Sequence, residues 1–253
     1  MRIDPDLGWK MLATFGAAAV FLYACGSGDK ANATGGPGTG GTSAGGSGGS
    51  GATGIGPSCA TDPLKTGLVA QQTNISVDAF DCQILKYTAQ YNEPDAMIFK
   101  AIIYVESRFD QTSVACPNNP CGVPSGWTTA ETGCFGLMQV VPACGPTPNN
   151  LGLLPNGHPN LTTDMSSSGW AGSIFNPDNN IAIGIYGVSD NRAQEKQKFS
   201  GCTEDQYTMM AIGDYNSYGS TQSCTQYNTA YDSLVLDAYN QYSAAAAWSA
   251  HNY

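Results

Sequence analysis

Basic residues are scarce in this chain of 253 residues. It has 10 lysines and arginines against 20 aspartates and glutamates, which gives a formal net charge of −10. Proteins that bind nucleic acids need a basic surface to neutralise phosphates, so the composition argues against a nucleic-acid partner. The acidic residues are scattered rather than grouped in blocks, which is typical of a solvated surface and identifies no partner.

Possible metal ligands are also few, and they do not form a recognisable motif. Cys116 and Cys121 are close enough in sequence to share a metal ion, but no second pair of that kind completes a zinc site. The two histidines, His158 and His251, are distant from these cysteines and from each other. We therefore predict neither a bound metal nor any other cofactor.

The chain has no apolar run long enough to predict a transmembrane helix with confidence. The apolar residues 11–24 follow basic residues and are typical of a signal peptide, which we place at residues 1–24. Leu22-Tyr23-Ala24-Cys25 resembles a bacterial lipobox, which implies lipidation of Cys25 and contact with a membrane through that anchor only. This predicts a lipoprotein of the bacterial cell envelope, on the periplasmic side or at the outer membrane. The alternative is an ordinary signal peptide and a secreted protein.

Residues 25–57 are mostly Gly, Ser, Thr and Ala, and Ile55 is the only large apolar residue among them. Such a segment buries too little surface to offset the entropy lost on ordering, so we predict a flexible linker. Gly45-Gly46-Ser47-Gly48-Gly49 within it matches the nucleophile elbow of hydrolases. Because this match does not lie between a strand and a helix, we treat it as chance.

Residues 58–253 are long enough for one well-packed domain and contain an even number of cysteines. In an exported chain this favours disulfides, although the sequence does not fix their connectivity, and the pair Cys202–Cys224 is only one candidate. No pattern indicates an oligomeric state. The eight cysteines are Cys59, Cys82, Cys116, Cys121, Cys134, Cys144, Cys202 and Cys224.

Apolar residues recur at helical spacing through most of this domain, and no alternating strand pattern is present. Two segments rich in Pro and Gly, residues 110–134 and 145–177, are predicted to be long loops that are functional or braced by disulfides. The fold class is therefore mainly α. The expected helices are residues 78–91, 96–107 (with Pro94 in the first turn), 178–198, 204–212 and 224–248.

One acidic residue lies beside an apolar stripe. Ile98, Ile102, Val105 and Phe109 lie on one helix face, and Glu106 at the margin of that face. A carboxylate late in a helix and near apolar surface is disfavoured by the helix dipole and by desolvation, and both raise its pKa. Glu106 is therefore a candidate proton donor.

Glu106 also has a simpler interpretation. It could be a solvated acid at a helix end, or the ion-pair partner of Arg108 or Lys100.

Four short motifs occur in a fixed order. Glu106-Ser107-Arg108-Phe109 is followed by Gly136-Leu137-Met138-Gln139, then by a Tyr-Asn turn in Asp214-Tyr215-Asn216, and finally by Tyr231 in the last expected helix. This ordered set resembles the catalytic domain of soluble lytic transglycosylases (glycoside hydrolase family 23), whose fold goose-type lysozymes share. The resemblance covers roughly residues 80–240 and implies a lysozyme-like helical domain.

The resemblance also implies a reaction and a partner, the glycan strands of peptidoglycan. Cleavage of a β-1,4 glycosidic bond needs an acid to protonate the leaving oxygen. In lytic transglycosylases one glutamate acts first as acid and then as base, and the 6-hydroxyl of the muramic sugar attacks to give a 1,6-anhydro end. Glu106 matches that glutamate. The positions that match the family's substrate-binding residues are Ser107, Met138, Gln139, Tyr215, Asn216 and Tyr231.

The chain departs from the family in places, and this leaves alternatives open. Goose-type lysozymes add aspartates that hold a hydrolytic water, and the acidic residues available here, Asp110, Glu131, Asp164 and Asp214, lie in no recognisable motif. A goose-type lysozyme that uses Glu106 is therefore one alternative. A catalytically silent glycan-binding lipoprotein and a disulfide-stabilised structural domain are two others. Asn180, Ile181 and Gly184 match the family's Asn-Ile-x-x-Gly helix, which we interpret as a packing motif.

Overall fold

The computed structural model describes residues 59, 61–115, 121–145, 147–166, 168–217 and 221–250. The predicted signal peptide at residues 1–24, Cys25 and the predicted linker at residues 25–57 lie outside these residues. No helix in the described part is both long and apolar enough to cross a membrane.

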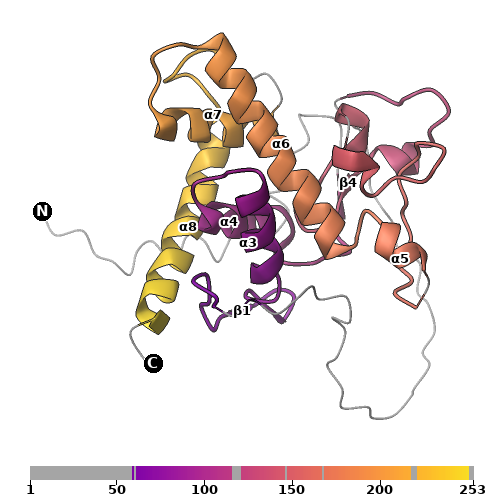
Figure 1. The fold of residues 1–253 in the computed structure, drawn as a ribbon, viewed down its shortest axis with the longest axis horizontal. Coiled ribbons are helices and arrows are strands. Elements are labelled where there is room, and N and C mark those ends of the chain that lie inside the picture. The colour runs from indigo at the N-terminus through magenta and orange to yellow at the C-terminus, as the bar shows by residue number, and fades with distance from the viewer. Residues whose placement is uncertain are drawn as a thin grey trace, which may run out of the picture.

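Helices dominate the described chain, as the sequence predicts (Figure 1). Between α4 and α6 lies a region of loops with three 3-10 turns and the short helix α5. The helices are α3 (Asp81–Gln90), α4 (Ala96–Ser107), α5 (Gly169–Gly172), α6 (Pro177–Lys198), α7 (Glu204–Asn216) and α8 (Thr229–Ala250). The 3-10 turns are η1 (Thr129–Thr132), η2 (Pro142–Cys144) and η3 (Pro148–Asn150).

Two antiparallel pairs of very short strands complete the described structure. β1 (Val69–Ala70) pairs with β2 (Ile75–Ser76), with Val69 opposite Ser76. β3 (Val114–Ala115) pairs with β4 (Cys134–Phe135), with Ala115 opposite Cys134. Each strand has only two residues, which is too short for an alternating pattern to appear in the sequence.

The hydrophobic core forms around α4, which packs along α8, while α3 contacts both α4 and α6 (Figure 1). Residues 97–103 of α4 are all buried. A helix that is apolar on nearly all sides belongs in the interior, which explains this central position. α8 contributes one buried stripe at helical spacing, formed by Tyr231, Val235, Ala238 and Tyr242.

Local chemistry explains where α4 begins and ends. Asp95 caps its N-terminus by accepting a hydrogen bond from the Met97 amide at 2.9 Å, so Pro94 precedes the cap and is not in the first turn as predicted. The helix ends at Arg108, which has a left-handed backbone with φ 55°. Glu106 is thereby placed in the last turn of α4.

Three predicted helix boundaries were wrong. The first helix begins at Asp81 and not at residue 78, because Asp78 instead receives hydrogen bonds from the Thr66 and Gly67 amides. α7 extends to Asn216, so Tyr215 and Asn216 lie in its last turn and not in a separate turn. α8 begins at Thr229 and not at residue 224.

Three disulfides are present among the described residues, as the cysteine content predicts. The candidate pair Cys202–Cys224 is present, and it holds the connection before α8 outside the helix. Cys134 is buried and is a free thiol, which corrects its prediction as a disulfide cysteine. Cys116 lies outside the described residues. The other two bridges are Cys59–Cys82 and Cys121–Cys144.

Candidate active site

Glu106 is held by a tyrosine from a distant part of the chain. The Tyr231 hydroxyl donates a hydrogen bond to Glu106 Oε1. Tyr231 lies at the start of the buried stripe of α8, and because α8 packs along α4, this stripe brings the hydroxyl to the end of α4. The structure thus joins the first and the last of the sequence-predicted motifs.

The surroundings of Glu106 favour its protonated form. Burial raises the pKa of Glu106 to about 7, while the hydrogen bond from Tyr231 and the charge of Arg108 oppose that rise. The residue still keeps part of its surface exposed. A carboxyl with a pKa near neutrality can both give and take a proton at physiological pH.

Neither suggested cation pairs with Glu106. Lys100 is fully buried and donates to Asp78, Asp81 and the Leu64 carbonyl. The Arg108 guanidinium lies over the Tyr104 ring, 3.9 Å from its centroid, and donates to the Tyr104 carbonyl. The ion-pair interpretation of Glu106 is therefore wrong.

Gly136-Leu137-Met138-Gln139 forms a tight turn after β4. Gly136 has φ 73°, and a Cβ there would lie 2.3 Å from the Asn180 amide nitrogen, so glycine is required for both conformation and space. Gln139 is 7% exposed, and its Nε2 donates to the Gly136 carbonyl at 2.8 Å. The Gln139 side chain thus stabilises the turn that carries it.

Met138 is fully buried and is the point where α6 and α7 meet this turn. Its amide donates to Asn180 Oδ1 at 2.8 Å, and its carbonyl accepts from the Tyr215 hydroxyl at 2.6 Å. A Cβ at Gly184 would lie 2.4 Å from Met138 Sδ, so the missing side chain makes room for Met138. The packing role predicted for Asn180 and Gly184 is confirmed.

Tyr215 belongs to the same cluster as Glu106. Burial raises the pKa of Tyr215 well above its ordinary value, and electrostatic interactions with Glu106 and Cys134 raise it further. The tyrosine is therefore neutral and serves as a hydrogen-bond donor to the Met138 carbonyl.

Cys134 is a site neighbour that sequence reasoning missed, because it was counted among the disulfide cysteines. Burial raises the pKa of its thiol to about 12, with Glu106 adding to the effect. The thiol is therefore neutral at physiological pH. The only sequence signal was its place directly before Phe135 and the Gly136 turn.

Ser107 and Asn216 have local structural partners. The Ser107 hydroxyl donates to the Ile103 carbonyl at 3.1 Å within α4. Asn216 Oδ1 accepts from Asn228 Nδ2 at 3.0 Å, which joins the end of α7 to the residues before α8.

Each of the acidic residues considered as a second carboxylate has a structural role. Asp110 accepts from the Thr112 amide, Asp164 from the Ser166 amide, and Asp214 from the Thr221 amide. Glu131 caps η1 and pairs with His158 at 2.8 Å. Within the described part of the chain, no group of three or more His, Cys, Asp or Glu side chains could hold a metal.

Comparison with known families identifies the same region. The model of the family described as "Transglycosylase SLT domain" matches residues 83–241. This range includes the four sequence motifs and excludes the β1–β2 segment. Comparisons with curated proteins and with solved structures found no match.

Proposed function

The chain belongs to the transglycosylase SLT domain family, and we propose that it is a peptidoglycan lytic transglycosylase. It cleaves the β-1,4 bond between MurNAc and GlcNAc and leaves a 1,6-anhydroMurNAc end. The observation that carries the proposal is the pairing of Glu106, whose pKa is about 7, with the Tyr231 hydroxyl.

In the first step, Glu106 acts as a general acid. At neutral pH a large fraction of the side chain is protonated, because its pKa is about 7. The proton passes to the glycosidic oxygen as the bond between that oxygen and the anomeric carbon breaks. The leaving group therefore departs as an alcohol and not as an alkoxide, which is a poor leaving group. The acetamido group of the substrate stabilises the positive charge that forms on the sugar.

In the second step, the Glu106 carboxylate acts as a base. It takes the proton of the 6-hydroxyl of the same muramic sugar while that oxygen bonds to the anomeric carbon, and Glu106 is thereby protonated again. Tyr231 donates its hydrogen bond to Glu106 Oε1, which supports the charged intermediate state of the acid. Glu106 thus performs both proton transfers without a water molecule.

Hydrolysis by a lysozyme mechanism is the alternative, and it needs a further group to hold a water. Asp110, Asp164 and Glu131 accept hydrogen bonds from their own loops. Asp214 accepts from Thr221. These contacts support the transglycosylase proposal, because each of the four is already engaged in local structure.

The test is mass spectrometry of products from purified peptidoglycan, with the wild type beside Glu106→Gln. The wild type is expected to release anhydro-muropeptides, and the variant to lose at least about a hundredfold in rate. Reducing muropeptides from the wild type would identify a lysozyme. No products from either protein, with the wild type shown to be folded, would favour a silent glycan-binding protein.

We propose in addition that the enzyme is exported and anchored by lipidated Cys25, which rests on the sequence Leu22–Cys25. Expression with labelled palmitate is expected to label the wild type and not Cys25→Ala. If both proteins stay unlabelled and soluble after export, the signal peptide is of the ordinary type.

A further inference from the structure

The segment of residues 61–80 precedes the family match at residues 83–241 but is built onto the helix that carries Glu106. It contains the β1–β2 pair, and the Cys59–Cys82 disulfide joins the residues that flank it on either side. We call residues 61–80 the N-terminal segment. It contacts α4 at two places, one near the middle of the helix and one just beyond its end.

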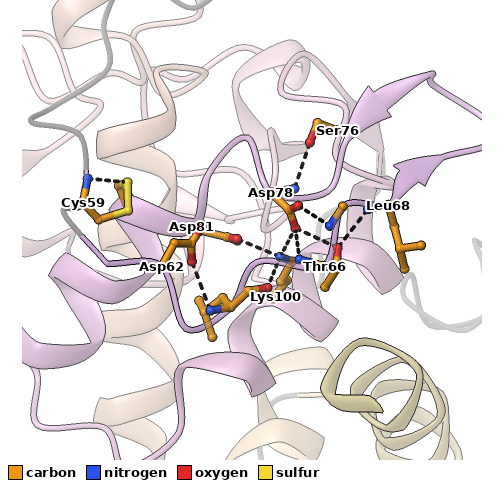
Figure 2. A network of polar contacts seen from close by, with 11 residues as sticks. Cys59, Asp62, Thr66, Leu68, Ser76, Asp78, Asp81 and Lys100 are labelled. Atoms are coloured by element: carbon orange, nitrogen blue, oxygen red, sulfur yellow. Dashed lines mark hydrogen bonds and ion pairs between the residues drawn. A yellow bond between two sulfur atoms is a disulfide. The ribbon is translucent and has the colours of Figure 1, made fainter. Parts of the chain in front are cut away.

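The first contact is a buried ion-pair network, drawn in Figure 2. Lys100 on α4 is 0% exposed, and its ammonium donates to the Leu64 carbonyl at 2.8 Å, to Asp78 at 2.6 Å and to Asp81 at 2.8 Å. Asp78 also accepts from the Thr66 hydroxyl at 2.7 Å. A lysine inside α4 therefore fixes both ends of the N-terminal segment to the helix.

The second contact lies two residues after Glu106 in the sequence. The Thr73 hydroxyl, in the turn between β1 and β2, donates to the Arg108 carbonyl at 2.9 Å. That turn is itself closed by a hydrogen bond from the Asn74 amide to the Ala70 carbonyl at 2.7 Å. Thr73 thus connects the N-terminal segment to the residue at which α4 ends.

The backbone at this point is strained. Arg108 and Phe109 both have left-handed conformations, with φ 55° and 65°. Consecutive left-handed residues other than glycine are unfavourable and persist only where the surroundings hold them. Phe109 is held by full burial against Tyr242, and Arg108 by its contacts with Tyr104 and with Thr73.

The position of Arg108 matters to Glu106, because the Arg108 charge opposes the rise in the Glu106 pKa. The other groups that interact with Glu106, namely Tyr231, Tyr215 and Cys134, come from α8, α7 and β4. Among these neighbours, Arg108 is the one that the N-terminal segment contacts through a hydrogen bond.

We propose that Thr73 is a positioning residue for the reaction, and that the N-terminal segment fixes the end of α4 so that Arg108 and Glu106 keep their geometry. The inference rests on the proposed function for its effect on rate. Its effect on the titration of Glu106 is independent of that function.

The test compares Thr73→Val with Thr208→Val in the full chain. Thr208 on α7 is half-buried, as Thr73 is, and its hydroxyl also donates to a backbone carbonyl, that of Glu204 at 3.0 Å, so both variants lose one hydrogen bond of the same kind. Thr73→Val is expected to lower the saturating rate of muropeptide release about fivefold, with little change in the half-saturating concentration. Thr208→Val is expected to match the wild type.

A second readout needs no activity. With carboxyl-labelled glutamate, NMR titration gives the pKa of Glu106, assigned by the signal missing in Glu106→Gln. Because Arg108 lowers this pKa, Thr73→Val is expected to raise it, and Thr73→Ser is expected to restore both the pKa and the rate.

An unchanged Glu106 titration in folded Thr73→Val would overturn the inference, whatever the rate shows. A wild type that releases no muropeptides would instead contradict the proposed function, and the titration would still decide the role of Thr73.

Discussion

Two ionisable side chains of α4, Lys100 and Glu106, show opposite ways of keeping a charged group inside a protein. Lys100 is fully buried and has three hydrogen-bond acceptors, two of them carboxylates. Glu106 keeps part of its surface exposed, and its side-chain partner is the neutral hydroxyl of Tyr231. Lys100 thus has charged partners for its ammonium, whereas Glu106 lacks a charged hydrogen-bond partner and has a pKa of about 7.

The difference follows from which partners each group has. A buried cation needs partners that offset the loss of water, and Lys100 has two aspartates and a backbone carbonyl. A carboxyl that meets only a hydroxyl and a more distant arginine has too little compensation, so burial raises its pKa, here to about 7. The same helix therefore carries a structural attachment near its middle and, at its end, the acid that we propose transfers protons.

Replacing the buried cation Lys100 should lower stability more than the other substitutions proposed below. We expect Lys100→Met to lower the free energy of unfolding by about 3–5 kcal/mol, because Asp81 is then a buried acid without its cation. Burial already raises the pKa of Asp81 to about 7, and Lys100 opposes this. The measurement is urea unfolding at pH 5 and pH 8.

The stability cost of Lys100→Met should depend on pH. Without Lys100 the folded pKa of Asp81 rises further above its unfolded value, so the folded state binds a proton that the unfolded state has lost. The cost of Lys100→Met should therefore be larger at pH 8 than at pH 5. The double variant Lys100→Met with Asp81→Asn should recover part of the stability at pH 8, and an equal cost at both pH values would contradict this account.

Removing the hydroxyl should sharpen the contrast at the other end of the helix. Tyr231→Phe takes away the hydrogen bond that lowers the pKa of Glu106, so that pKa should rise above about 7. Since Glu106 works in its protonated form in the proposed mechanism, the loss of activity at alkaline pH should move to higher pH. We expect a rate about tenfold lower at neutral pH, because a hydrogen bond to a charged group contributes about 1.5–3 kcal/mol.

The pH profile of muropeptide release measures both effects. Tyr239→Phe is the matched control, because Tyr239 is also on α8 and its hydroxyl donates to Asp95 at 2.7 Å, away from Glu106. If Tyr231→Phe kept the wild-type profile, Tyr231 would have no part in tuning the acid.

The position of Glu106 in its helix could be predicted from the sequence, because the signals for it are local. The apolar stripe predicts α4, and the position of Glu106 beside that stripe predicts the raised pKa of Glu106. α6 was predicted to within one residue of its start from its acidic first turn at Asp178 and its apolar residues, and in the structure Asn176 caps this helix and Pro177 begins it. The Tyr231 register came from the family resemblance, and the hydrogen bond to Glu106 agrees with it.

The partners of Lys100 could not be predicted, because they depend on contacts between residues that are distant in the sequence. Nothing near Lys100 in the sequence indicates that its partners are Asp78, Asp81 and a carbonyl from residue 64. The free thiol of Cys134 was missed for the same reason, since the count of cysteines suggested pairing. Strands of two residues and the left-handed pair after Glu106 likewise depend on tertiary packing that overrides local preference.

An exposed ion pair completes the comparison with the smallest expected effect. Lys86 of α3 contacts Asp178 of α6 at 2.9 Å, with side-chain exposures of 53% and 25%, so it has the chemistry of the Lys100 network without its burial. We expect Lys86→Met to lower the free energy of unfolding by less than about 1 kcal/mol.

Salt screens exposed charges, so this cost should shrink further in 1 M NaCl, whereas the cost of Lys100→Met should persist there. Urea unfolding of both variants at low and high salt measures the difference. A cost for Lys86→Met as large as that for Lys100→Met would show that burial does not set the strength of these pairs.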